Sequence, residues 1–180
     1  MSRELIFLGP DAIERKLVGK IITRFEEAGF RIIKMKMGKM PEKLARLMYV
    51  DTEEYCRSVG EKTLKGMKEN KISEGEVRKT FGSLDPVEIG RHIVKWKREY
   101  ETAGDIIGVI IEGNDAAKRT RAFIGYTDPS KADKGTVRGD LGNDSIMKAN
   151  MEKRAVKNLL HASDEERAEI EIKYFEENFF

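Results

Sequence analysis

The stretch Leu5-Ile-Phe-Leu-Gly-Pro-Asp11 joins a short apolar run to a Gly-Pro pair and an aspartate. A run of this length that ends in turn residues predicts a buried strand, and the aspartate can cap a helix that follows it. Apolar residues then recur at helical spacing, with a glycine where such a helix would end: Leu17, Val18, Ile21, Ile22, Phe25 and Gly29. We therefore expect the chain to open with a strand followed by a helix.

Three further strands are expected beyond this stretch. Phe30–Met37 predicts the second strand, because Ile33, Met35 and Met37 alternate with lysines. The methionines of this region, up to Met40, are expected to fill the core. Two later segments have strand character as well: Asp105–Glu112 and Ala155–His161.

Helices are expected between these strands and after the last of them. Pro41 begins a short helix, and Asp115–Ile124 has a helical pattern. Ser163-Asp-Glu-Glu166 is a capping-box pattern that starts a final helix, which runs to about Phe175. The segment between the second and third strands is polar and mostly helical, and Asp85-Pro-Val-Glu88 is a good helix start within it.

This order of elements indicates an α+β fold of ferredoxin-like type. We expect a four-stranded antiparallel sheet with helices packed on it, plus a helical insert over residues 51–104. One domain over residues 1–180 is the natural expectation at this length.

Composition narrows the class of protein. The net charge of +2 does not predict a nucleic-acid partner. Cys56 is the only cysteine, so a disulfide framework and a multi-cysteine zinc site are excluded. The longest apolar run, near Ile106–Ile111, is far too short to span a bilayer, and Met1 is not followed by a signal-peptide core. We expect a cytoplasmic protein without a membrane partner.

Three motifs near the C-terminus carry the chemistry: Gly125-Tyr-Thr-Asp-Pro129, Gly135-Thr-Val-Arg-Gly-Asp140 and Asn158-Leu-Leu-His-Ala-Ser-Asp164. Together with Arg121 they place arginines upstream of one histidine. Arginine recognises phosphate oxygens through a planar fork of donors, and a histidine beside it can accept a phosphoryl group. The residue types therefore suggest phosphoryl transfer. Taken singly, the same residues have ordinary interpretations, such as a partly buried histidine, surface ion pairs and glycine turns.

The motifs make the chain resemble nucleoside diphosphate kinases. The resemblance covers Glu4–Val50 and Gly104–Phe175, and its N-terminal part rests on Gly9-Pro-Asp-Ala12 and on the helix and strand that follow. Residues 51–104 look like a longer insert carried by some members, mainly archaeal ones. The resemblance implies transfer of the γ-phosphate of a nucleoside triphosphate to a nucleoside diphosphate through a phosphohistidine intermediate.

The resemblance also implies a role for each matching residue. His161 matches the nucleophile, and Tyr49 matches the tyrosine beside it. Glu171, with Glu169 as an alternative, matches the glutamate that holds the other ring nitrogen. Four residues match the nucleotide ligands, of which the first three bind phosphate and the last the ribose: Arg121, Thr127, Arg138 and Asn158.

Cofactor and partners follow from the same resemblance. It implies nucleoside di- and triphosphates as ligands and Mg²⁺ held mainly by the nucleotide phosphates, with no protein metal ligands. It also implies a homo-oligomer, either a hexamer or a tetramer, formed partly through the loop that contains Pro129.

One departure from the family pattern concerns Gly9, which stands where the family has a lysine that contacts the transferring phosphate. Lys16 and Lys20 are candidate replacements. The departure motivates an alternative function, a nucleotide-binding or regulatory homologue with weak turnover. The phenylalanine that stacks on the base has no clear match, and Tyr55 is the candidate for it.

Overall fold

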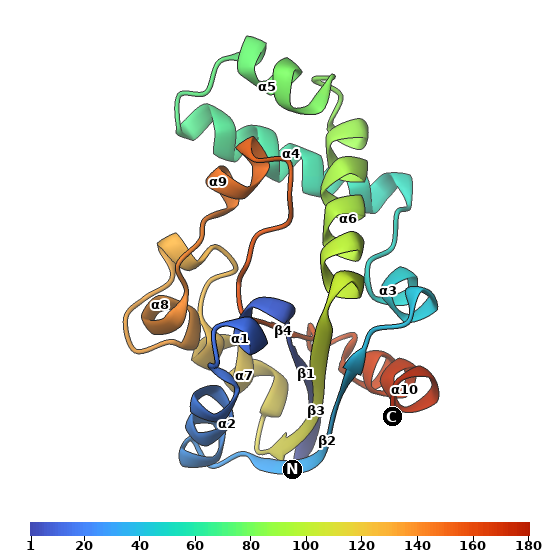
Figure 1. Cartoon of the computed structure of the whole chain (residues 1–180), viewed down its shortest axis with the longest axis vertical. Coiled ribbons are helices and arrows are strands. Elements are labelled where there is room, and N and C mark those ends of the chain that lie inside the picture. The colour runs from blue at the N-terminus through green and yellow to red at the C-terminus, as the bar shows by residue number, and fades with distance from the viewer.

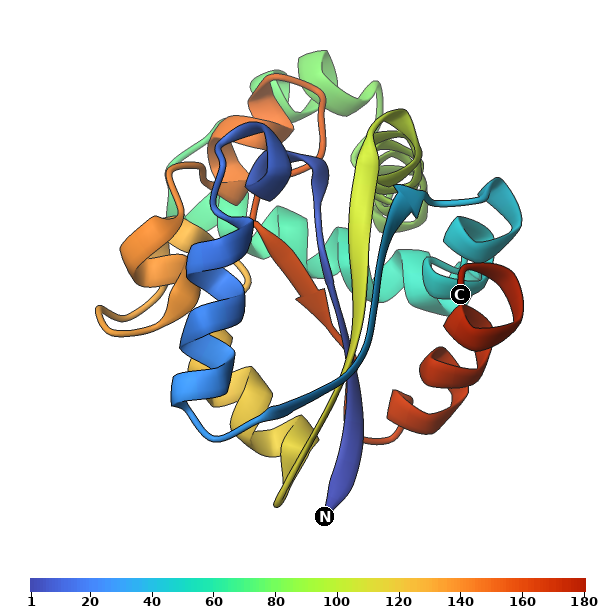
Figure 2. The same cartoon turned by 60° about the horizontal axis from the view of Figure 1, so that its bottom comes forward.

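The computed structural model describes residues 1–180 and contains one sheet of four strands. The strands are β1 (Ser2–Leu8), β2 (Arg31–Lys39), β3 (Asp105–Gly113) and β4 (Leu160–Ala162). Their order across the sheet is β2-β3-β1-β4, and every neighbouring pair is antiparallel. Helices cover the sheet, as Figures 1 and 2 show. The predicted α+β fold of ferredoxin-like type is thus confirmed.

Strand β1 lies in the middle of the sheet and is buried on both faces. It pairs with β3 through Leu5 and Ile110 and through Ile6 and Val109. Successive side chains of a strand point to opposite faces, so a strand covered on both sides needs an unbroken apolar run. This is why residues 5–8 contain no polar side chain.

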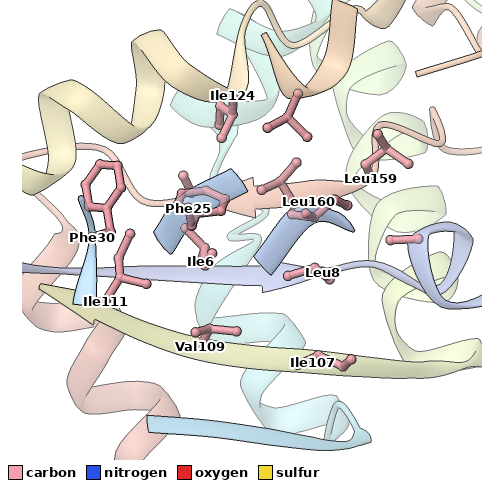
Figure 3. Close-up of a cluster of buried hydrophobic side chains, with 14 of the residues drawn as sticks. Ile6, Leu8, Phe25, Phe30, Ile107, Val109, Ile111, Ile124, Leu159 and Leu160 are labelled. Carbon is pink, nitrogen blue, oxygen red and sulfur yellow. The ribbon is translucent and has the colours of Figure 1, made fainter. Parts of the chain in front are cut away.

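One face of the sheet is covered by three helices: α1 (Pro10–Glu14), α2 (Val18–Glu27) and α7 (Ala116–Ile124). Figure 3 shows the core between these elements, where Ile6 and Val109 of the sheet lie below Phe25 and Ile124 of the helices. The predicted first helix is in fact two helices. The backbone between them takes a positive φ of 57° at Lys16, which no helix accommodates.

The opposite face is covered by α3 (Glu42–Met48) and α10 (Ala168–Asn178). Leu5 and Phe7 of β1 pack here with Leu44, Ile172 and Phe175. The aromatic C-terminal tail is docked as well, because Phe179 is buried in the same cluster. Figure 1 shows α10 and the C-terminus beside α3.

Three helices connect β2 and α3 to β3: α4 (Glu53–Glu69), α5 (Glu74–Phe81) and α6 (Pro86–Ala103). Asp85 accepts a hydrogen bond from the Val87 N–H and caps α6, as the sequence predicts. The α4 and α6 backbones cross closely at glycines. A Cβ at Gly60 would lie 1.8 Å from the carbonyl oxygen of Pro86. The helical content is as expected, while the division into one domain with an insert over residues 51–104 stays a prediction.

Short helices fill the region between α7 and β4: η1 (Pro129–Lys131), α8 (Val137–Leu141) and α9 (Ile146–Met151). No helix of the chain has the length and apolar character needed to cross a bilayer.

The methionines of β2 correct one sequence prediction. Met40 is buried, but Met35 and Met37 are 54% and 53% exposed, and Ile33 is 40% exposed. Met35 and Met37 pair with Val109 and Ile107 in the register, but β2 is an edge strand of the sheet and leaves both side chains exposed. The alternation correctly predicts a strand, but it does not reveal that this face is uncovered.

The last strand and the last helix also differ from their predicted bounds. Strand β4 contains only Leu160–Ala162, because Leu159 has a positive φ of 72° that ends the extended chain before it. Helix α10 begins at Ala168 and runs to Asn178. Ser163 does not cap it, because its hydroxyl donates a hydrogen bond to Glu171 instead.

Candidate functional site

His161 lies in the middle of β4, directly opposite Phe7 of β1. Its ring stacks on the Phe7 ring with centroids 4.9 Å apart and an interplanar angle of 21°. The side chain is 24% exposed, so one edge of the imidazole is accessible while the ring is held by packing. The imidazole is therefore positioned by the sheet rather than by a mobile loop.

Glu171 of α10 fixes one nitrogen of this imidazole. The Nε2 of His161 lies 3.1 Å from Oε2 of Glu171. The same oxygen accepts a hydrogen bond of 2.7 Å from the Ser163 hydroxyl, and Oε1 pairs with Nε of Arg167 at 3.1 Å. Burial opposes ionisation of Glu171, but the hydrogen bonds from His161 and Ser163 and the charge of Arg167 hold its pKa below the ordinary value. Glu171 is therefore an ionised group that orients the histidine.

Tyr49, at the C-terminal end of α3, closes the other side of the imidazole. Its ring contacts His161 edge-on, with centroids 6.1 Å apart. The residue is 7% exposed and its hydroxyl has no hydrogen-bond partner. Burial, and after it the charge of Glu101, raises the pKa of Tyr49, so the hydroxyl stays protonated.

Arg138 of α8 is buried beneath the segment that precedes His161. It donates to three carbonyl oxygens, those of Asn158, Gly125 and Leu160, at 3.1, 2.9 and 2.6 Å. Burial, and after it the charge of Arg121, lowers the pKa of Arg138 to about 10, which leaves it charged at neutral pH. A guanidinium has five N–H donors, so two remain for a ligand after these three bonds.

The remaining predicted ligands lie around Arg138. Asn158 is buried, and its Nδ2 donates to the carbonyl oxygen of Thr127 at 3.1 Å. Thr127 is exposed in the loop after α7. Arg121 of α7 is half exposed and pairs with Asp164, the last residue of the histidine motif. The side chains of Arg121 and Thr127 thus reach solvent, while Asn158 and Arg138 are buried beneath them.

Two residues of the first βα junction hold the backbone that leads into β4. Asp11 accepts a hydrogen bond from the Leu159 N–H at 3.1 Å, and Gly9 donates its N–H to the Leu159 oxygen at 2.8 Å. Tyr100 of α6 donates its hydroxyl to the other oxygen of Asp11 at 2.7 Å. Sequence reasoning assigned Asp11 only a helix-capping role and did not identify Tyr100.

The structure brings most of the predicted site residues together. His161 contacts both Glu171 and Tyr49, and hydrogen bonds link Arg138, Asn158 and the Thr127 backbone. Glu171 contacts His161, whereas Glu169 is exposed and pairs with Arg3. The contacts of Glu171 with Ser163, which lies within the histidine motif, and with Arg167, which follows the motif, were not predicted.

Three other residues considered from the sequence form no hydrogen bond or ion pair with this cluster. Lys16, between α1 and α2, and Lys20, within α2, are both exposed. Tyr55 lies on α4 and is 38% exposed. No group of three or more histidine, cysteine, aspartate or glutamate side chains is arranged to hold a metal ion.

Comparison with known proteins agrees with this geometry. The sequence model of one family, described as nucleoside diphosphate kinase, matches residues 2–70 and 61–179. The chain is 43% identical over 177 residues to the nucleoside diphosphate kinase of Pyrobaculum aerophilum, across 97% of this chain and 94% of that protein.

Solved structures agree as well. An NDP kinase from Pyrobaculum aerophilum has a TM-score of 0.89 and 40% identity, over 98% of this chain and 97% of that one. A nucleoside diphosphate kinase from Halobacterium salinarum in complex with CDP has a TM-score of 0.65 and 26% identity, over 97% and 86%. The chain belongs to the nucleoside diphosphate kinase family, whose enzymes bind nucleotides and transfer phosphate between nucleoside triphosphates and diphosphates.

Proposed function

We propose that this chain carries out the family reaction through a phosphohistidine at His161. The observation that carries the proposal is the 3.1 Å contact between Nε2 of His161 and Glu171. Because Glu171 is ionised, it accepts a hydrogen bond from the N–H of Nε2, which leaves Nδ1 as the nitrogen with a free lone pair. An imidazole held in this tautomer is a nucleophile near neutral pH.

The reaction proceeds in two half-reactions. In the first, Nδ1 forms a bond to the γ-phosphorus while the bond from that phosphorus to the β,γ-bridging oxygen breaks, and a nucleoside diphosphate leaves. In the second, a terminal oxygen of another nucleoside diphosphate attacks the same phosphorus and the N–P bond breaks. Glu171 stabilises the positive charge that develops on the imidazole in each transfer.

The other predicted residues bind the nucleotide in this proposal. Arg121 and Arg138 offset the charge on the transferring phosphoryl oxygens, and Thr127 donates a hydrogen bond to phosphate. Asn158 contacts the ribose hydroxyl, and Tyr49 forms the wall of the site. The two unused N–H donors of Arg138 and the exposed Arg121 support these roles.

Catalysis in this family uses a divalent cation. We take this cation to be Mg²⁺, coordinated mainly by nucleotide phosphates, because Mg²⁺ commonly binds through substrate phosphates and water. Mg²⁺ would supply charge neutralisation on the phosphate oxygens.

We also propose that the protein is a homo-oligomer and that it is cytoplasmic. The exposed face of edge strand β2, with Ile33, Met35 and Met37, supports a homo-oligomer, because an uncovered apolar edge favours association with a second copy. A tetramer and a hexamer are both compatible with it, and the loop containing Pro129 is a further proposed contact. The single free cysteine, Cys56, supports a reducing, cytoplasmic location.

Phosphorylation of His161 can be tested against an internal control, because the chain has only one other histidine, His92. Incubation with ATP and Mg²⁺ should add one acid-labile, alkali-stable phosphoryl group, detected by intact-mass analysis. His161→Asn should abolish this adduct. His92→Asn should retain it, because His92 packs against Phe81 and Trp96 in the insert. An unphosphorylated wild-type protein would overturn the proposal.

The alternative function, a regulatory homologue with weak turnover, is not favoured. A relative that is 43% identical over nearly the whole chain is described as a nucleoside diphosphate kinase. The glycine at position 9 therefore needs an explanation other than loss of activity.

A further inference from the structure

A buried ion pair outside the site described above lies on the last turns of α6. The Nζ of Lys97 is 2.7 Å from Oε1 of Glu101, and the two side chains are only 20% and 2% exposed. A pair this deeply buried is poor evidence of stabilisation, because desolvation of both charges offsets their attraction. Glu101 Oε2 also has no hydrogen-bond partner. The pair is therefore a candidate for a role other than stability.

The position of Lys97 connects it to the histidine. Its Nζ lies 5.7 Å from the centroid of the Tyr49 ring and 5.6 Å from that of the Tyr100 ring. Tyr49 contacts His161, and Tyr100 donates to Asp11. The ammonium thus sits between the two tyrosines that border the site. Figure 1 shows α6 descending to α1 before it continues into β3.

Gly9 lies against the same carboxylate. A Cβ placed on Gly9 would be 3.2 Å from Oδ1 of Asp11, 3.6 Å from the Tyr100 hydroxyl and 3.7 Å from Oε2 of Glu101. The backbone of Gly9 is extended, with φ of −75° and ψ of 170°, so its conformation does not require glycine. The first carbon of any side chain at position 9 would therefore lie close to the Glu101 carboxylate, which pairs with Lys97. Because Gly9 has no side chain, the space beside this carboxylate is left to Lys97.

We propose that Lys97 is the ammonium group of the phosphate site, delivered by α6 from the insert in place of a lysine at position 9. This inference rests on the proposed phosphohistidine mechanism. Glu101 holds Lys97 beside Tyr49, and a flexible lysine stem lets Nζ reach the transferring phosphoryl oxygens. Lys97 forms and breaks no covalent bond, and it stabilises the charge on those oxygens. Residues 51–104 thereby contribute directly to the chemistry.

The test measures the single-turnover rate of phosphohistidine formation from ATP and Mg²⁺. Lys97→Met should lower this rate by roughly a hundredfold to a thousandfold, as expected when one electrostatic donor is removed. ADP affinity should change far less, because ADP lacks the transferring phosphoryl group. The matched control is Lys95→Met on the same helix, whose side chain is 69% exposed and which should react at the wild-type rate.

A double variant separates the effect of Lys97 on the rate from the effect of leaving Glu101 without its ion-pair partner. Lys97→Met leaves Glu101 unpaired, so the double variant Lys97→Met/Glu101→Gln should recover thermal stability and yet remain slow. Adding Gly9→Lys to this double variant should restore at least a tenfold part of the lost rate. An unchanged rate in Lys97→Met, or recovery of the wild-type rate in the double variant, would overturn the inference about Lys97. The proposed function would still stand in that case, provided that the wild-type protein forms the phosphoryl adduct on His161.

Discussion

Asp11 and Leu159 are 148 residues apart in the chain, and a hydrogen bond from the Leu159 N–H to Asp11 Oδ2 joins them at 3.1 Å. Leu159 has a positive φ of 72°, which is unfavourable for a branched side chain. The bond holds this strained residue two positions before His161. The first βα junction therefore determines where the histidine lies.

Removal of this anchor should affect both stability and catalysis. Asp11→Ala leaves the Leu159 N–H and the Tyr100 O–H without the carboxylate oxygens that accept their hydrogen bonds, which costs about 1–3 kcal/mol for each buried donor. We expect a lower melting temperature and at least a tenfold lower phosphorylation rate. Asp11→Asn retains one acceptor and should fall between wild type and Asp11→Ala. Wild-type kinetics for Asp11→Ala would contradict the anchoring role.

Glu171→Gln should slow the reaction without preventing nucleotide binding. The amide cannot stabilise imidazolium-like charge, and a loss of roughly tenfold to a hundredfold is typical of a missing orienting group. The pKa of Glu171 is lowered in the fold, so its ionised form stabilises the protein above the ordinary pKa, and this contribution is lost as pH falls through the folded value. The destabilisation of Glu171→Gln, measured by urea unfolding, should shrink toward pH 3. Glu169→Gln, two residues away and exposed, is the control.

Glu4 should make the protein less stable as pH rises. Burial, the largest cause, raises its pKa to about 7 from 4.5, even though Oε1 accepts a hydrogen bond from the Ser163 N–H. The folded state therefore keeps a proton that the unfolded chain releases, and stability falls between pH 4.5 and about 7. Glu4→Gln should remove this decline and stabilise the protein at pH 8 by about 2–3 kcal/mol. Parallel pH profiles for variant and wild type would refute the assignment.

Charges on β2 should disrupt assembly and leave the fold intact. Met35→Lys/Met37→Lys places two charges on an exposed edge, where the free energy of unfolding of a single chain changes by no more than about 0.5 kcal/mol per site. Light scattering should show a smaller particle than the wild type. Ile170→Lys adds a charge on α10 at a residue that is 46% exposed, and it should keep the wild-type mass. An unchanged mass for the double variant would exclude β2 as the contact.

The crossing of α4 and α6 should not tolerate a methyl group. A Cβ at Gly90 would lie 1.9 Å from the Cys56 carbonyl oxygen, so Gly90→Ala should destabilise the protein by about 1–3 kcal/mol despite its better helix propensity. Gly66→Ala, where no atom lies within 4 Å, should instead stabilise by about 0.5–1 kcal/mol. Chemical denaturation compares the two. Equal effects would show that the helices are not packed this closely.

Several features were predictable because they depend on local or linear patterns. Apolar runs bounded by turn residues correctly predict β1 and β3, and Asp85-Pro86 predicts the start of α6. The residue types were sufficient to suggest phosphoryl transfer, with Arg121 just upstream of the three motifs and Arg138 and His161 within them. These signals act over a few residues, so sequence alone carries them.

Other features were decided only by contacts between distant segments. The sequence pattern predicts that Ser163 caps a helix. Its hydroxyl instead donates a hydrogen bond to the carboxylate of Glu171, and α10 begins later than the pattern predicts. Met35 and Met37 alternate like core residues, but they lie on an edge strand of the sheet and are exposed. Neither outcome is visible in local spacing, since each depends on which elements pack together.

The sequence by itself determined the family, the order of the elements and the histidine that accepts the phosphoryl group in our proposal. It also showed that position 9 has no side chain. Only the tertiary structure placed Lys97 beside Glu101 and Tyr49, because α6 ends against the first βα junction and brings residues 9 and 97 to the same carboxylate. Short-range patterns specify helices and strands, whereas a site assembled from four distant segments is specified by their packing.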